Sequence, residues 1–414
     1  MNRPLFIIIG SVVILILILI WVYVLFIKDN FTNTNNTGNS GTFSNLDLED
    51  TSLDPNSTDS SQDNDELLSS TTDTGERKKL RQLTTKRVVG FSEINASTSD
   101  VAYFIEAGVG HMYEVDIFTG QERRISATTF PDTYSGEMST DGKFFVLQTG
   151  YTANRETHVG SIDVSALAAV SAHKLEKGVV SYDLLEENKL VYAINNSNNL
   201  TVRSYDLESE SSKELFTVPF QEAQILWGDA EAGPHFFFPK PASGLEGFLY
   251  EYRDGTIRRL PLDGFNFSAY ASHNLSLGTF EKSSKYQSAL FSKDTDATVS
   301  LVKPLVPQKC LLTRDSSIIC GIDVSENIDG VTFQNWLQGA ARFADDIYSI
   351  NIEDGERVEL ANTLSITGRT IDVMQMEQGT KHPFVYFINK NDQTLWIYEH
   401  EPTIEDNDLE DDNE

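Results

Sequence analysis

The stretch that decides the fold is His111-Met112-Tyr113-Glu114-Val115-Asp116, followed by a turn at Thr119-Gly120 and by Arg123-Arg124-Ile125. Apolar and polar residues alternate in the first segment, which is the pattern of a half-buried β-strand. The glycine-containing turn and the short basic segment after it indicate a hairpin. This segment therefore predicts antiparallel β-structure.

The same pattern returns along the chain. Two clear copies occupy residues 248–260 and 346–360, with turns at Asp254-Gly255 and Asp354-Gly355. Weaker copies lie at residues 157–164, 201–207, 298–302 and 395–398. The segments recur about every 44–49 residues, which is the period of a four-stranded propeller blade. We predict an all-β, seven-bladed β-propeller in which each copy is the third strand of a blade and is preceded by a second strand, such as residues 287–291 before residues 298–302.

A closing strand is expected from the N-terminal side of the domain. The last copy has no fourth strand, because the chain becomes acidic soon after Tyr398. Lys78-Lys79-Leu80-Arg81-Gln82-Leu83-Thr84 resembles the fourth strands and precedes the first blade. We predict that residues 79–85 pair with the final blade and so cover a sheet edge. The alternative is a basic patch at the membrane surface.

Residues 5–27 form an unbroken apolar run without a charged residue. As a helix this run measures roughly 34 Å, enough to cross a hydrocarbon core of about 30 Å. Arg3 precedes the run, and after Lys28 no Lys or Arg occurs until Arg77. The positive-inside rule then places residues 1–4 in the cytoplasm and the rest outside. The prediction is a single-pass cell-membrane protein with an extracytoplasmic C-terminal domain.

Composition separates the remaining parts. Residues 28–77 are an acidic linker rich in Asn, Ser and Thr, and residues 401–414 are an acidic tail, so both are expected to be disordered. The propeller domain is expected at residues 78–400. A formal net charge of -30 argues against nucleic acid and anionic lipid as partners, because phosphate binding requires clustered Lys and Arg.

Two resemblances agree with this layout. Ser139-Thr140-Asp141-Gly142-Lys143 resembles the Ser-Pro-Asp-Gly-Lys blade signature of TolB-like propellers, with Thr in place of Pro. Other segments resemble a family of membrane-anchored propeller proteins from candidate-phyla bacteria (Parcubacteria and relatives). These segments are Leu80-Arg81-Gln82-Leu83-Thr84, residues 110–116, Gln308-Lys309-Cys310, Trp336-Leu337-Gln338-Gly339 and residues 387–396. The resemblance covers about residues 78–398 and implies the same anchor, linker and propeller, without supplying catalytic residues.

Motifs for known chemistry are missing. The sequence has no Gly-X-Ser-X-Gly, no phosphate loop and no His-Glu-X-X-His, and its histidines are scattered. We therefore predict no catalytic residues, no cofactor and no metal site. Asp345-Asp346 is interpreted as a turn before a strand. No His, Asp or Arg cluster is expected at the first strands of the blades, which would line a central funnel.

Cys310 and Cys320 are the only cysteines. In a hairpin centred on Asp315 they would lie opposite each other on one face. In an oxidising compartment they could form a cross-strand disulfide. The alternative is a pair of buried free thiols, and the sequence leaves both open.

Residues 323–345 are the one long insertion inside a blade. They carry Trp336, Gln338, Arg342 and Phe343, which are candidate binding residues because Trp and Arg dominate interface hot spots. The insertion joins the second and third strands of the sixth blade, on the face where propellers usually bind ligands. In the alternative, Trp336 and Phe343 simply cover the edge of the blade core.

These features favour a non-catalytic module that binds or scaffolds a protein, peptide or glycan in the cell envelope. The alternative is an envelope propeller enzyme, a glycan hydrolase or lyase, with its site in the central funnel. Three or more convergent, buried, charged side chains in the funnel would favour the enzyme. A bland funnel beside an exposed aromatic patch would favour the binding module.

Overall fold

The computed structural model describes residues 77–400, apart from 96–97, 152–153, 165–169, 186–187, 314–316 and 326–327. The predicted membrane anchor at residues 5–27, the linker up to residue 76 and the acidic tail lie outside these residues. Within the described ranges, no helix is long and apolar enough to cross a membrane.

Antiparallel strands make up most of the described chain, in five four-stranded sheets and one seven-stranded sheet. Three of the four-stranded sheets use strands that are consecutive in sequence. The first contains β2 (Val88–Glu93), β3 (Val101–Glu106), β4 (Met112–Asp116) and β5 (Glu122–Arg124). The second contains β6 (Thr133–Met138), β7 (Phe144–Thr149), β8 (Glu156–Ser161) and β9 (Ser171–Lys174). The third contains β10 (Val179–Leu185), β11 (Lys189–Asn195), β12 (Leu200–Asp206) and β13 (Ser211–Val218).

The seven-stranded sheet is held together by one long strand. It contains β14 (Ala223–Leu226), β15 (His235–Pro239), β16 (Glu246–Arg253), β17 (Thr256–Ser272), β18 (Leu275–Lys282), β19 (Lys285–Ser292) and β20 (Ala297–Ser300). The first half of β17 pairs with β16, where Tyr252 lies opposite Ile257. The second half pairs with β18, where Ser272 lies opposite Leu275. The sheet therefore consists of two four-stranded arrangements that share β17.

The C-terminal part forms the last two sheets and carries the helices. One sheet contains β21 (Cys310–Leu312), β22 (Ser317–Asp323), β23 (Asp345–Asn351) and β24 (Arg357–Ala361). The other contains β25 (Val373–Gln378), β26 (Phe384–Asn389), β27 (Thr394–Glu399) and β1 (Leu80–Gln82). The helical segments are η3 (Pro307–Lys309), α2 (Gly330–Leu337) and α3 (Thr363–Thr367).

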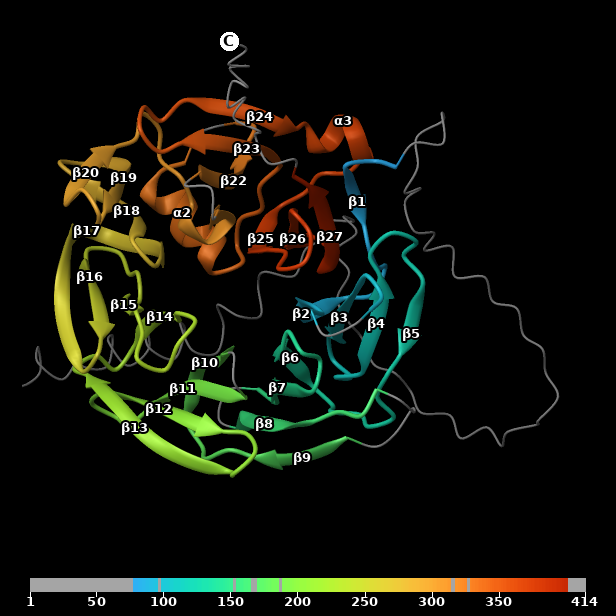
Figure 1. The fold of residues 1–414 in the computed structure, drawn as a ribbon. Helices are drawn as coiled ribbons and strands as arrows, with labels where there is room; N and C mark the ends of the chain where they lie inside the picture. Colours follow the sequence, from blue (N-terminus) through green and yellow to red (C-terminus); the bar gives the residue numbers. More distant parts are fainter. Residues whose placement is uncertain are drawn as a thin grey trace, which may run out of the picture. The chain divides into compact units, whose positions relative to one another are not determined.

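The strand expected near residues 79–85 joins the last sheet. β1 runs antiparallel to β27, with Leu80 opposite Tyr398. Arg81 on this strand is buried and donates hydrogen bonds to Glu399 Oε1 at 2.6 Å and to the Ile117 carbonyl at 2.8 Å. The first and last described strands therefore share one sheet, as Figure 1 shows in blue and dark red.

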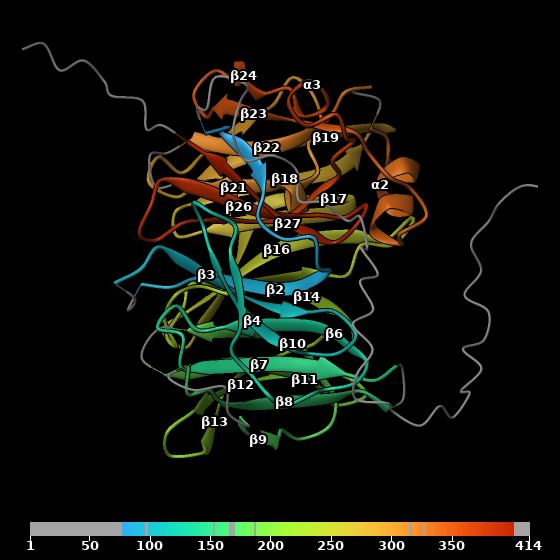
Figure 2. The same cartoon turned by 90° about the vertical axis from the view of Figure 1, so that its right-hand side faces the viewer.

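The sheets stand side by side around a central region (Figure 1), with β2, β6, β10, β14 and β25 toward the centre and β5, β9, β13 and β24 at the periphery. Apolar side chains fill the space between neighbouring sheets. One such cluster joins Phe91 and Phe104 of the first sheet to Tyr386 and Ile397 of the last. Figure 2 shows α2 standing out on one face of this arrangement.

One predicted register is wrong. Residues 287–291 belong to β19, the third strand counted from β17, and residues 298–302 overlap β20, the fourth. The turn between β18 and β19 explains the error. Its two turn residues are Ser283 and Ser284, both with positive φ (53° and 59°). Gly or Asn is the usual residue at such positions of a tight hairpin and would have indicated the turn. The sequence therefore hides β18 as a separate strand.

Candidate functional site: the acidic central cavity

A cavity of about 580 Å³ lies where inner strands of several sheets converge. Four carboxyl groups line it: Glu137 from β6, Asp183 from β10, Glu377 from β25 and Asp229 from the segment after β14. Among the described residues that line this cavity there is no Lys or Arg. The wall therefore carries a one-sided negative potential, which low-dielectric surroundings concentrate.

The inner strands deliver these acids in polar pairs. Each pair is spaced i, i+2, which places both side chains on one face of a regular strand. The pairs are Ser135 with Glu137, Ser181 with Asp183, and Gln375 with Glu377, and all six residues line the cavity. At the third pair a bulge with Gln375 at a φ of 54° interrupts this alternation in β25. An inner strand of an apolar core would place aliphatic residues there instead. The pattern is thus a departure from core packing.

Glu137 and Asp183 form a carboxyl pair on neighbouring sheets. The Leu184 N–H of β10 donates a hydrogen bond of 3.1 Å to Glu137 Oε1. Burial raises the pKa of Glu137 well above its usual range, and the nearby charge of Asp183 raises it further. Burial also raises the pKa of Asp183, while the hydrogen bond from Glu137 opposes that rise. Because the pKa values of both carboxyls are raised, the pair favours a shared proton.

Glu377 is a third carboxyl with an unusual proton affinity. Its side chain keeps accessible surface because it faces the cavity, yet protein surrounds it on the other sides. This enclosure raises the pKa of Glu377 to about 8, with a further contribution from the Asp183 charge. Burial raises the pKa of Tyr270 to about 12, and the charge of Glu377 adds to it. The enclosure by protein therefore favours the neutral form of the Glu377 carboxyl.

Hydrogen bonds between strands fix the cavity wall. The hydroxyl groups of Ser135 and Tyr182 lie 2.6 Å apart and join β6 to β10. The indole N–H of Trp227 donates to Ser181 Oγ at 3.0 Å and joins the segment after β14 to the same strand. The wall thus offers aromatic and hydroxyl groups next to the carboxyls.

The expectation of no His, Asp or Arg cluster at the first strands did not consider glutamate, and two of the three acids found there are glutamates. Glu137, Asp183 and Glu377 are all on inner strands, and they were missed because their convergence depends on strands far apart in sequence. The i, i+2 polar pairs were the available signal. In the described ranges, no group of three or more His, Cys, Asp or Glu side chains is arranged to hold a metal ion.

The insertion residues divide between core and surface. Trp336 (4% exposed) and Phe343 (7% exposed) pack with Phe333 against Val306. Gln338 and Arg342 are exposed. The buried pair matches the alternative in which the insertion covers a core. Only the other two candidate binding residues present an accessible side chain.

A buried ionic cluster lies beneath the insertion. Lys309 Nζ contacts Asp345 Oδ2 and Asp372 Oδ1, and all three side chains are at most 1% exposed. The ammonium group also lies 4.9 Å from the ring centre of Trp336, whose indole N–H donates to Asp372 Oδ1 at 2.8 Å. Burial raises the pKa of Asp345 to about 6, and Lys309 opposes that rise. The cluster contains its own cation.

The interpretation of Asp345-Asp346 as a turn is wrong. Both residues begin β23, and both are buried. Asp346 Oδ1 accepts a hydrogen bond of 2.7 Å from the Thr363 N–H at the start of α3. The two acids look like a turn in sequence, but their partners Lys309 and Thr363 supply the compensation that burial requires.

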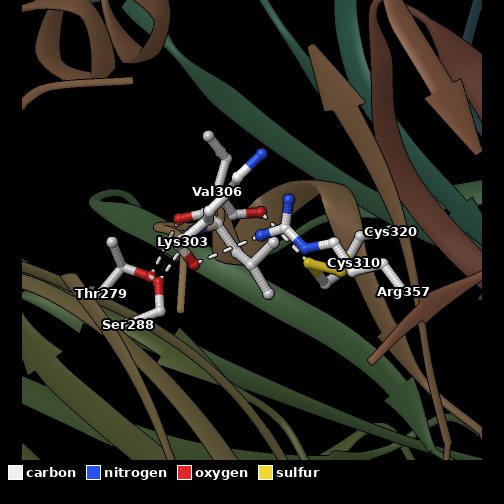
Figure 3. Close-up of a disulfide and its surroundings, with 8 residues drawn as sticks. Thr279, Ser288, Lys303, Val306, Cys310, Cys320 and Arg357 are labelled. Atoms are coloured by element: carbon white, nitrogen blue, oxygen red, sulfur yellow. Dashed lines mark hydrogen bonds between the residues drawn. A yellow bond between two sulfur atoms is a disulfide. The ribbon is translucent and has the colours of Figure 1, made fainter. Parts of the chain in front are cut away.

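Cys310 and Cys320 lie opposite each other in the β21–β22 register and are joined by a disulfide, with their Cα atoms 4.1 Å apart (Figure 3). Residues 314–316, where the turn was expected, lie outside the described ranges. The bond fastens the short edge strand β21, whose neighbour along the chain is Lys309. The disulfide thus anchors β21, the strand that begins directly after Lys309 of the ionic cluster.

Comparisons with known proteins identify the fold. No protein-family model matches the chain, and no curated protein sequence matches it significantly. The β-propeller domain of the Trilobed protease from Pyrococcus furiosus is similar at 12% identity and a TM-score of 0.50, covering 76% of this chain and 96% of that one. The described chain has a β-propeller fold. An oligogalacturonate lyase from Vibrio parahaemolyticus is a second propeller-like neighbour, at 11% identity and a TM-score of 0.50, with 81% and 96% covered.

Identities this low relate the folds alone, so neither neighbour's chemistry transfers to this propeller. The lining of the central cavity gives an independent reading. It contains acids and no described cationic side chain, so it repels a polyanion.

Proposed function

We propose that this chain is a membrane-tethered, extracytoplasmic propeller that binds ligands carrying protonated amines in its acidic central cavity. The anchor at residues 5–27 and the linker at residues 28–77 would hold the domain outside the cell membrane. We count seven blades, taking the seven-stranded sheet as two blades that share β17 and taking β1 as the fourth strand of the last blade.

The observation that carries the proposal is the cluster of four carboxyl groups without a described Lys or Arg in the same wall. Of the four, Glu137 and Asp183 are half-buried, Glu377 is exposed toward the cavity, and Asp229 is 74% exposed beside His273. Enclosed carboxyls without a compensating positive group favour their neutral forms. A ligand ammonium group supplies that compensation and allows Glu377 to ionise. Tyr270 and Trp227 in the same wall add aromatic surface, which attracts cations.

The convergence of Glu137, Asp183 and Glu377 in the central cavity is the feature expected of an enzyme, so a second candidate function is acid–base hydrolysis of a glycan. The supporting observation is that Glu377, with a pKa of about 8, keeps a proton near the Glu137–Asp183 pair. Glycoside hydrolysis uses one carboxylic acid to protonate the leaving oxygen and a second carboxylate to assist attack. Because the cavity is acidic, the substrate would be a neutral or amino-sugar glycan, and not a uronate.

The binding test uses the full chain reconstituted in lipid nanodiscs and isothermal titration calorimetry. The probes are trilysine and a glucosamine trimer, each compared with its fully N-acetylated form. We expect one or both amine forms to bind and the acetylated forms to bind at least tenfold more weakly. A glycan source predicts the glucosamine trimer alone, and a peptide source predicts trilysine.

Two variants make the test specific. Glu377→Gln should weaken binding of the amine probe about tenfold, while Asp254→Asn, at an exposed turn, should leave it unchanged. Wild-type affinity for trilysine, whose side-chain amines stay protonated in this range, should rise between pH 6 and 8.5 because the cation favours the ionised form of Glu377. Equal binding of acetylated and free amines would overturn the proposal. Cleavage of either sugar trimer, abolished by Glu377→Gln, would instead establish the hydrolase.

A further inference from the structure

The central acidic cavity adjoins a second cavity of about 530 Å³, which we call the outer cavity. The two cavities share Asp229, Tyr270 and Ser272 among their lining residues. Glu377 of the acidic cavity is also followed directly in β25 by Gln378, which lines the outer cavity. A ligand held in the acidic cavity can therefore extend into the outer cavity.

The outer cavity lies at the ends of the strands that are opposite to the insertion. Of its lining residues, Leu275 begins β18 directly after the β17–β18 turn, and Ile352 lies in the connection between β23 and β24. Helix α2 belongs to the connection between β22 and β23, at the other end of β23. Connections between antiparallel strands alternate between the two ends of a sheet. The outer cavity and α2 are therefore on opposite faces of the propeller.

Three aliphatic side chains give the outer cavity an apolar wall. They are Leu275, Leu312 and Ile352, and all three are half-buried. Each of them packs against the core that contains the Cys310–Cys320 disulfide. The wall is thus supported from behind by the core and keeps accessible apolar surface in front. An aliphatic group that covers this surface removes it from water, which is favourable.

The charge of the outer cavity matches that of the acidic cavity. Asp229 and Asp294 contribute carboxyl groups, and none of the described residues in this lining is Lys or Arg. Lys293, next to Asp294 in sequence, directs its ammonium group away to Glu251 Oε1 at 2.8 Å. His273 Nε2 lies 3.0 Å from Asp229 Oδ2. A ligand that spans both cavities therefore meets carboxyl groups in each and is favoured by a positive charge.

Resting on the amine-binding function proposed above, we propose that the ligand is a peptide in which a lysine stands next to an aliphatic residue. The flexible four-carbon stem of the lysine carries its ammonium group into the acidic cavity. The neighbouring aliphatic side chain covers Leu275 and Ile352 in the outer cavity. An amino-sugar glycan also supplies an amine, but its hydroxyl groups leave the aliphatic wall without an apolar partner.

The test is isothermal titration calorimetry on the full chain in lipid nanodiscs. The probes are the peptide amides Leu-Lys-Leu and Ser-Lys-Ser, which carry equal charge, with trilysine and the glucosamine trimer as reference ligands. We expect Leu-Lys-Leu to bind about tenfold more tightly than Ser-Lys-Ser, because partial burial of one leucine side chain contributes roughly that factor.

The reference ligands separate this inference from the amine-binding function. Equal affinities of the two peptide amides, with trilysine bound, would overturn the inference and leave the amine-binding function standing. Binding of the glucosamine trimer alone would have the same consequence. If no amine probe binds, both proposals are overturned.

Variants assign the leucine preference to the outer cavity. Ile352→Thr and Leu275→Asn each place a polar group in the aliphatic wall and should lower the affinity ratio of the two peptide amides to about threefold or less. Val358→Thr, on a valine of β24 that is 57% exposed, is the matched control and should keep the tenfold ratio. Glu377→Gln should weaken both peptide amides alike.

The ratio is taken within each variant, so damage to the fold lowers both affinities, whereas damage to the outer cavity lowers that of Leu-Lys-Leu alone. If one variant fails to fold, the other one decides. A ratio that stays near tenfold in a folded Ile352→Thr or Leu275→Asn protein would overturn the proposal.

Discussion

Two groups of acids in this propeller differ in whether a cation of the protein compensates their charge. Asp345 and Asp372 surround Lys309, so their charges are compensated within the protein. Glu137, Asp183 and Glu377 line the central cavity, and none of the described residues in that wall is a Lys or Arg. The first group is closed by the indole of Trp336, and the second borders a volume of about 580 Å³.

The difference separates an acid that holds the fold from an acid that is kept for a ligand. A compensated pair can be removed from water because its partner replaces the lost hydration. Burial raises the pKa of both kinds of acid, to about 6 for Asp345, where Lys309 opposes the rise, and to about 8 for Glu377, where no described cation opposes it. Four predictions test this comparison: the first three run from the largest expected effect to the smallest, and the fourth has the opposite pH dependence.

Replacing Lys309 with Met should be the most damaging change. It leaves Asp345 and Asp372 buried without a cation, and such a change typically destabilises a protein by about 3–5 kcal/mol. Urea unfolding at pH 7.5 measures the loss. Lys143→Met is the matched control, because the Lys143 side chain is 68% exposed in its pair with Asp141 and should contribute less than about 1 kcal/mol. Similar losses in both variants would remove the distinction between the two groups.

Trp336→Phe should have an intermediate effect. It keeps an aromatic ring but deletes the N–H that donates to Asp372, and losing a hydrogen bond to a buried charged group costs about 1–3 kcal/mol. Trp227→Phe in the central cavity deletes a bond to the neutral Ser181 hydroxyl and should cost about 1 kcal/mol or less. Chemical denaturation compares them. A larger loss for Trp227→Phe would contradict the assignment of structural roles.

The smallest effect is a pH-dependent gain from Glu377→Gln. Folding raises the pKa of Glu377 from its ordinary value near 4.5 to about 8, so the folded state binds more protons in that window. Stability from this group is therefore present at low pH and is lost as pH rises through 8. Solvent screens the exposed Glu377 carboxyl and reduces the gain, so we expect the variant to melt about 1–2 °C higher at pH 8.5 and equally at pH 4.

Asp206→Asn should change the pH dependence of stability in the opposite direction. Backbone and side-chain hydrogen bonds from Ser209 lower the pKa of Asp206 to about 2. Its stabilising contribution is therefore present above about pH 4 and is lost as pH falls toward 2. Differential scanning calorimetry across pH should show this variant destabilised at pH 7. If Glu377→Gln behaves in the same way, Glu377 is a structural acid and not one kept for a ligand.

The sequence predicted more of the fold than of the candidate site. Local signals are strong where an aromatic-centred strand ends in Asp-Gly, as at Asp254-Gly255, and the pairing of β1 with β27 followed from a missing strand. They failed at Ser283-Ser284, because a serine turn with positive φ has no local mark. The convergence of Glu137 and Glu377 could not be predicted from local sequence, because it depends on how distant inner strands meet. With 62 Asp and Glu residues in the chain, no single acid stands out in the sequence.

The pairing of β1 with β27 also sets an order of events during synthesis. Arg81 and its partner Glu399 are 318 residues apart, so an early segment must wait unpaired until almost the whole chain has been made. Contacts so distant in sequence form slowly, and edges left open meanwhile invite wrong pairing. A chain that stops before residue 394 lacks β27 and leaves β1 without a partner. The last sheet is thus completed only after β27, at the C-terminal end of the domain, has been synthesised.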